Sequence, residues 1–146
     1  MKRLSRTLGR AAALVLAGCQ EGAPPDAFPI RVEGAWVRGV PSGNTAAYMT
    51  ITSADGHADR LLELHAPDAA RVELHRTRID ESGLARMEPA GGLQIGPGES
   101  VRMEPGGLHA MLFEIRRPLA AGDTVVLRLL FAAAGEVRVR APVRAR

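Results

Sequence analysis

The chain is 146 residues long, a length that fits one globular domain. Its hydrophobic fraction of 46% and charged fraction of 24% exclude an intrinsically disordered chain and a mainly membrane-spanning one. The pI of about 10 resembles that of a nucleic-acid-binding protein, but four basic residues lie within the first ten positions. Without residues 1–18, 15 basic residues face 16 acidic ones and the net charge is −1, so we expect no nucleic-acid partner.

The first predicted element is an export signal over residues 1–18. A basic start precedes the apolar run 11–17, which is too short to cross a bilayer. Leu16-Ala17-Gly18-Cys19 resembles the bacterial lipobox, which implies cleavage before Cys19 and attachment of fatty acids such as palmitate, and hence a membrane anchor. Residues 19–29 would form a proline-rich spacer. The alternatives are a plain signal peptide with an incidental cysteine and a core cysteine of a cytosolic protein.

Short apolar–polar alternations, separated by turn-forming residues, recur about every ten residues from position 30 onward. They predict strands at 30–37, 46–52, 60–65, 71–77, 84–88, 100–103, 108–115, 124–131 and 136–143. No stretch has helical spacing with caps, and residues 66–70 form a single turn at most. The pattern predicts one all-β domain over residues 30–146, an antiparallel β-sandwich with Greek-key connections.

His75 is a candidate ligand because of the strand face on which it lies. Val72 and Leu74 share one face, so His75 projects from the other and is not expected in the core. Met87 lies in the next predicted strand. The turn at residues 80–83 is expected to bring these two strands side by side.

His109 and Met111 are two residues apart, so they project from one strand face about 7 Å from each other. Thioether sulfur is a neutral, polarizable ligand that selects copper(I), and imidazole also suits copper. A site without thiolates is also safe from disulfide formation in an oxidising compartment. Together, His75, Met87, His109 and Met111 predict a copper(I) site.

The spacing of these four residues resembles the PCu(A)C-type periplasmic copper chaperone family, named for the copper-A centre of cytochrome oxidase. The family motif is His, eleven residues, Met, twenty-one residues and then His-x-Met, and both gaps match here. Segments 35–38 and 45–48 also look like the family. The resemblance implies a cupredoxin-like sandwich that carries copper(I) across the periplasm to a protein acceptor, such as an oxidase subunit or its assembly factors.

Two features depart from the family pattern. Arg76 stands where some members have a second methionine, and residues 143–146 lack the His- and Met-rich tail that some members carry. We therefore expect no second site for copper(II).

Other residues of similar type are not assigned to the site. His57 and His65 are interpreted as surface histidines, and Met49 and Met103 as core methionines. Trp36 either covers the copper or packs in the core, and we prefer core packing.

Three functions compete on this reading. The first, which we favour, is a copper(I) carrier whose ligands lie on an exposed edge, so that a partner can take the ion by ligand exchange. Because these side chains face away from the core, we expect substitution of His109 or Met111 to leave the fold intact. A copper redox enzyme or electron carrier is disfavoured, because the mature domain lacks the cysteine ligand of a blue-copper site. The third is a metal-free structural or assembly lipoprotein. Nothing in the sequence supports catalysis, since it has no Ser-His-Asp set, phosphate loop or CxxC.

Overall fold

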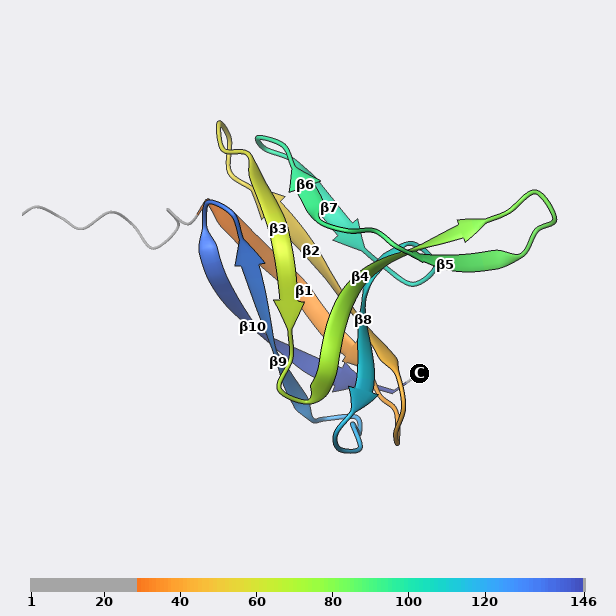
Figure 1. The fold of residues 1–146 in the computed structure, drawn as a ribbon. Coiled ribbons are helices and arrows are strands. Elements are labelled where there is room, and N and C mark those ends of the chain that lie inside the picture. Colours follow the sequence, from red (N-terminus) through yellow and green to blue (C-terminus); the bar gives the residue numbers. More distant parts are fainter. Residues whose placement is uncertain (1–28, 146) are drawn as a thin grey trace, which may run out of the picture.

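The computed structural model describes residues 29–145, and their regular structure consists of strands alone (Figure 1). The expected signal peptide, Cys19 and nearly all of the spacer lie outside the described residues. The strands are β1 (Ile30–Arg38), β2 (Thr45–Ser53), β3 (Asp59–His65), β4 (Ala69–Ile79), β5 (Ala85–Pro89), β6 (Leu93–Ile95), β7 (Ser100–Met103), β8 (Leu108–Ile115), β9 (Thr124–Phe131) and β10 (Gly135–Arg144).

The predicted all-β class is confirmed, and each of the nine predicted runs forms a strand. The sequence did not predict the remaining strand, β6. Its three residues lie between turn-forming glycines and are too few to show an apolar–polar alternation. Residues 66–70 contain the expected turn, closed by a hydrogen bond from Ala69 N to Ala66 O. Within the described part of the chain, no helix has the length and hydropathy needed to cross a membrane.

The strands form one sheet in the order β5-β4-β8-β2-β1-β10-β9-β3-β6, with β7 paired to β2. Because β3 also pairs with β4, at Leu64 and Val72, the sheet closes on itself around a common core. The predicted antiparallel pairing is confirmed for the other strand pairs of residues 29–145, but β1 and β10 run parallel where Val37 faces Val143. These strands are far apart in the sequence, and such long connections allow parallel neighbours.

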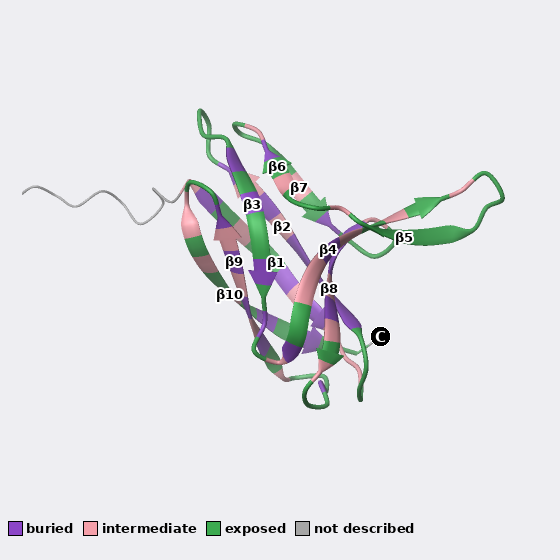
Figure 2. Ribbon diagram, viewed as in Figure 1, coloured by how far each residue is buried: buried purple, intermediate pink, exposed green. Residues whose placement is uncertain are grey.

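Strand β2 is unusual because it is buried on both faces. β9 alternates between buried and less buried residues along its length, as a strand with one core face does. In β2, Met49 and Ile51 enter the core, yet Ala46 and Tyr48 on the opposite face are buried as well. Figure 2 shows the buried residues in the body of the sheet and the exposed β4–β5 hairpin beyond it. The second covered face of β2 belongs to the candidate site.

A buried carboxylate joins the start of β3 to the β9–β10 turn. Asp59 Oδ1 accepts hydrogen bonds from Arg60 N (2.7 Å) and Ala133 N (2.9 Å), and Oδ2 accepts one from Ala134 N (2.8 Å). Burial acts to raise the pKa of Asp59, but these backbone donors outweigh it and lower the pKa below its ordinary value.

Replacing Asp59 with Ala is expected to destabilise the fold by about 1.5–3 kcal/mol, because three backbone N–H groups lose hydrogen bonds to a charged acceptor. Urea unfolding of the two proteins measures the difference. Glu104→Ala is a suitable control, because the Glu104 side chain is exposed and its ion pair with Arg102 is long, at 3.9 Å. An Asp59→Ala protein as stable as the control would contradict this role.

Candidate metal centre

The register of β4 and β8 places His75 directly opposite His109. Directly opposite residues of an antiparallel pair project from the same face of the sheet. The centres of the two imidazole rings are 6.2 Å apart. Met111 lies two residues beyond His109 on this face, opposite Ala46 of β2.

Met87 reaches the same face from β5. It pairs with Thr77, which is two residues beyond His75 on β4, so Met87 and His75 share a face. Met87, His109 and Met111 line one cavity of about 180 Å³. The structure thus brings the four predicted ligands onto one face of β5, β4 and β8, and three of them onto one cavity.

His109 is buried, with 3% of its surface exposed, so the expectation that it would be solvent-exposed is wrong. His109 does share a strand face with Met111, as the alternation of side chains along β8 predicts. Neighbouring strands cover this face: the His109 ring centre is 6.5 Å from that of Tyr48 on β2, and 6.2 Å from that of His75 on β4.

One nitrogen of His109 has the properties of a metal ligand. Nδ1 lies 3.0 Å from the carbonyl oxygen of Gly107, and because a carbonyl only accepts, Nδ1 carries the proton. In the neutral ring Nε2 then has a free lone pair, and this atom is buried without a hydrogen-bond partner. An unsatisfied buried acceptor costs about 1–3 kcal/mol. A metal ion bound to Nε2 would remove this cost, so the residues present fit a soft metal.

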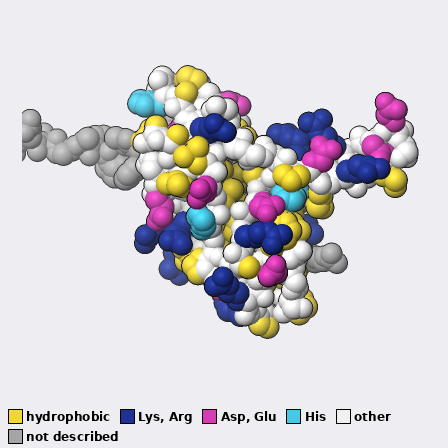
Figure 3. Space-filling view, viewed as in Figure 1, with side chains coloured by type: hydrophobic (Ala, Val, Ile, Leu, Met, Phe, Trp, Pro, Cys, Tyr) yellow, Lys and Arg dark blue, Asp and Glu magenta, His cyan; other side chains and the backbone are white. Residues whose placement is uncertain are grey.

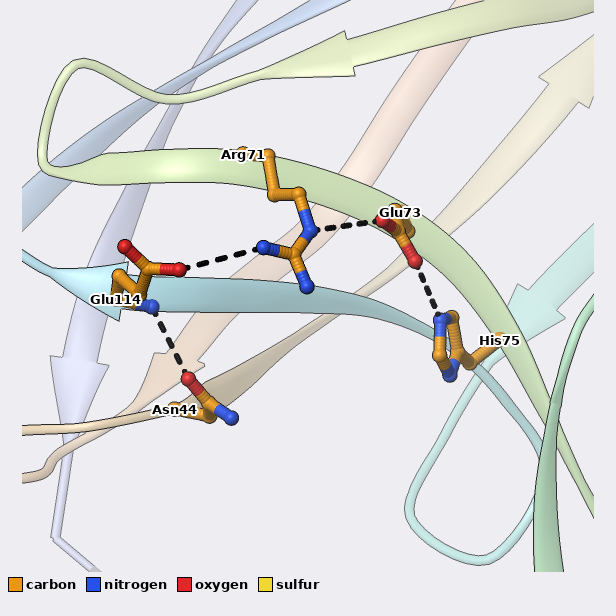
Figure 4. Close-up of polar contacts among 5 residues, drawn as sticks. All are labelled: Asn44, Arg71, Glu73, His75 and Glu114. Carbon is orange, nitrogen blue, oxygen red and sulfur yellow. Dashed lines mark hydrogen bonds and ion pairs between the residues drawn. The ribbon is translucent and has the colours of Figure 1, made fainter.

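A chain of charged side chains orients His75 (Figure 4). His75 Nε2 donates to Glu73 Oε2 at 3.0 Å, which leaves Nδ1 as its free nitrogen. Arg71 donates to Glu73 Oε1 at 2.9 Å and to Glu114 Oε1 at 3.3 Å, and Glu114 N donates to Asn44 Oδ1 at 3.0 Å. The hydrogen bonds from His75 and Arg71 lower the pKa of Glu73.

Sequence analysis placed Glu73 on the face of His75 but gave it no role. The signal was present, because an acidic residue two positions before a histidine ligand, in the same strand, projects beside it. Carboxylates that accept the second N–H of a histidine ligand are common around metals and fix the ring orientation.

The β4–β5 hairpin projects from the body of the domain (Figures 1 and 2). Met87 on β5 is 60% exposed, whereas His75 retains 12% exposure of its side chain. Apolar and charged side chains lie together on the hairpin in the space-filling view (Figure 3). The exposure of the four predicted ligands therefore rises from the buried His109 to the accessible Met87.

Trp36 is only partly buried and lies outside the core, so the preferred core position is wrong. It pairs with Tyr48 on the site face of β2, and the two ring centres are 4.5 Å apart. Tyr48, which sequence analysis did not single out, is buried and lines the cavity. Trp36 is not among the cavity-lining residues, and its ring packs against that of Tyr48.

The residues that were not assigned to the site lie away from the cavity. His57 and His65 are exposed and contact Asp55 and Glu63, respectively. The prediction of core positions for Met49 and Met103 is confirmed, because they face each other across β2 and β7 and are buried. Among residues 29–145, no cluster of three His, Cys, Asp or Glu side chains could hold a metal ion.

Comparison with protein families gives a match across most of the chain. The family described as "Putative lipoprotein LpqE-like" matches residues 30–143. The chain belongs to the LpqE-like family. A relative of this LpqE-like chain, "Putative lipoprotein Lxx21020" of Leifsonia xyli subsp. xyli, is 29% identical over 150 aligned positions, which cover 97% of this chain and 90% of the relative.

Solved structures of PCuAC domains have the same fold. Copper(I)-bound DR1885 from Deinococcus radiodurans is 32% identical with a TM-score of 0.66, over 82% of this chain and 81% of that one. The copper-bound PCuAC domain of PmoF2 is 26% identical with a TM-score of 0.67, over 81% and 94%. The predicted PCu(A)C-type family and its β-sandwich fold are therefore confirmed.

Asp80 organises the turn that positions Met87. Its Oδ1 accepts from Ser82 N and Leu84 N, both at 3.0 Å, and its Oδ2 accepts from Arg86 Nε at 2.9 Å. Hydrogen bonds from Ser82, Arg86 and Leu84 lower the pKa of Asp80 from 3.8 to about 2.

The order of this hairpin should therefore depend on pH. Because the folded-state pKa lies below the unfolded one, ionised Asp80 stabilises the hairpin fully above pH 3.8, and this contribution is lost as the pH falls through about 2. NMR titration of the Ser82 and Leu84 amides should show a midpoint near pH 2, absent in Asp80→Asn. A midpoint near 3.8 would show that the turn does not hold the carboxylate.

Proposed function

We propose that this protein binds one copper(I) ion through His75, Met87, His109 and Met111, and passes it to an acceptor protein. The observation that carries this proposal is the bare, buried Nε2 of His109 in a cavity that two thioethers also line. A lone pair without a proton donor, beside two soft sulfur atoms, suits a soft cation better than it suits water or a hard ion.

The ligand set fits the lower oxidation state of copper. Thioethers and neutral imidazoles carry no charge, and thioether sulfur prefers copper(I). The carboxylate of Glu73, beside His75, is engaged by His75 and Arg71. Solved relatives that carry copper or copper(I), with 26% and 32% identity, support the same reading.

The accessibility of one proposed ligand, Met87, supports transfer rather than redox catalysis. Met87 is exposed on a projecting hairpin, so an acceptor can reach the metal by replacing this ligand first. The chain's cysteine, Cys19, lies far from the motif in sequence and is the expected lipid-attachment site, so a blue-copper centre lacks its thiolate. We therefore propose a carrier, with an oxidase copper centre or its assembly factors as candidate acceptors.

Removal of one sulfur tests the site with little risk to the fold. Met87→Leu and Met111→Leu nearly conserve side-chain volume, so the free energy of unfolding should stay close to that of the unaltered chain. Their copper(I) affinity should fall more than about tenfold, the lower bound for loss of an outer-shell partner. Anaerobic competition with a chromophoric chelator measures the affinity of the chain from Gln20 onward.

Leu84→Ala provides the matched control, because Leu84 is 61% exposed on the same hairpin as Met87, which is 60% exposed. This control should bind copper(I) as the unaltered chain does. If the unaltered chain binds no copper(I), or if the methionine variants bind it equally well, the metal-free assembly lipoprotein becomes the better hypothesis.

We also propose that the domain is held at a membrane, facing the periplasm, by lipid on Cys19. Membership of a lipoprotein family supports the anchor, and Cys19 itself lies outside the described residues. Two or more acyl chains hold a protein at a bilayer far more firmly than one.

The anchor can be tested in cells. Cys19→Ser should move the protein from the membrane fraction to the soluble fraction without changing copper(I) binding by the domain. Immunoblotting of fractionated cells measures the distribution. A Cys19→Ser protein that stays with the membranes would contradict lipidation.

A further inference from the structure

Arg38 is the one permanently charged side chain in the lining of the cavity that contains Met87, His109 and Met111. The other described lining residues are neutral polar or apolar, apart from His109, whose Nε2 is the proposed ligand atom. A cation at this position is unexpected for a site that serves only to hold another cation, because like charges repel in a partly buried environment.

The structure holds the Arg38 guanidinium in place. Nη2 donates to the hydroxyl of Tyr48 at 2.9 Å, and the centre of the guanidinium lies 5.8 Å from the Tyr48 ring centre. The hydroxyl of Thr45 donates to the backbone carbonyl of Arg38 at 2.6 Å. Because Tyr48 is buried beside His109, the guanidinium is fixed with respect to the metal ligands.

The charge of Arg38 has no counterion in the described part of the chain. Over residues 29–145, none of the ion pairs includes Arg38. By contrast, Arg71 and Arg86 each bind a carboxylate at 2.9 Å. A guanidinium has five N–H donors, and the Tyr48 hydroxyl takes one of them.

We propose that Arg38 forms an anion subsite beside the copper(I) site, which receives a thiolate of the copper acceptor during transfer. This inference rests on the proposed function. A neutral ligand set leaves copper(I) with one positive charge, so an entering anion is attracted by both the metal and the guanidinium. Among anionic side chains, thiolate is the one that copper(I) prefers, whereas carboxylate suits harder ions.

The transfer step involves no redox change. The thiolate enters already deprotonated and donates an electron pair to copper, which remains copper(I). A Cu–S(thiolate) bond forms as the bond to the accessible Met87 breaks, and the thioether keeps its own lone pair. The bonds to the remaining ligands then break as the acceptor supplies further donors, and the released thiolate–copper unit leaves the subsite.

The charge of the acceptor provides a test on the copper(I)-loaded full chain in detergent. Stopped-flow absorbance follows copper removal by anionic bathocuproine disulfonate and by uncharged neocuproine. Arg38→Gln should slow removal by the anionic chelator about tenfold, the lower end of electrostatic steering, and leave removal by neocuproine unchanged. Arg38→Lys should restore much of the rate because it keeps the charge.

Arg144→Gln is the matched control. Arg144 lies beside Arg38 in the register of β10 and β1 and stacks on Trp36 at 5.3 Å, but it does not line the cavity. It should exchange copper at the unaltered rate. Equal slowing by Arg144→Gln, or equal slowing with both chelators, would overturn the subsite and assign Arg38 a general or structural effect.

Glutathione and S-methylglutathione identify the anion, because they carry the same carboxylates and differ in the thiol. Glutathione should remove copper faster from the unaltered chain than from Arg38→Gln. The rate of removal by S-methylglutathione should be the same for both proteins. If both act alike, the subsite takes carboxylates and the thiolate assignment is wrong. The equilibrium copper(I) affinity, measured first, separates the two hypotheses: loss of binding in the unaltered chain refutes the proposed function, whereas normal binding with charge-independent transfer refutes only the subsite.

Discussion

The pairing of β4 with β8 is the constraint on which the site depends, because it sets His75 opposite His109. The register runs from Ala69 opposite Ile115 to Arg76 opposite Leu108, and the hydrogen bond from Thr77 N to Gly107 O continues the contact beyond it. A slip of one residue would move every side chain of one strand to the other face and separate the histidines. Side-chain chemistry at the site is therefore secured by backbone hydrogen bonds, which do not depend on a bound metal.

Burial divides the four candidate ligands into two kinds. His109 is enclosed by Tyr48 and His75, so its unpaired Nε2 is held ready without competition from water. Met87 lies on a projecting hairpin whose turn is tied by Asp80, so it can leave and return without disturbing the core. A rigid, desolvated donor favours retention of a metal, whereas an accessible one favours exchange. The same fold supplies both because the covered face of β2 adjoins the free hairpin.

Charge is also arranged on two sides of the ligands. Glu73 on β4 accepts a hydrogen bond from His75 and another from Arg71, so a negative charge lies beside one imidazole. Arg38 on β1 faces the cavity from the other side, tied to Tyr48 and without a carboxylate partner in the described chain. The proposed ligand His75 is therefore oriented by a carboxylate on the β4 side, and an unpaired cation lies on the β1 side. An anionic ligand of the acceptor would approach from the side of the cation.

The sequence by itself determined the all-β class, nearly all of the strands and the strand faces of His75, His109 and Met111, because alternation is a local property of the chain. The spacing of His75, Met87, His109 and Met111 also indicated the family. Only the tertiary structure decided that His109 is buried, that Trp36 lies outside the core and that β1 runs parallel to β10. Alternation assigns a side chain to a face, but burial depends on which distant strands cover that face. Those neighbours are chosen by long-range pairing, which no local pattern records.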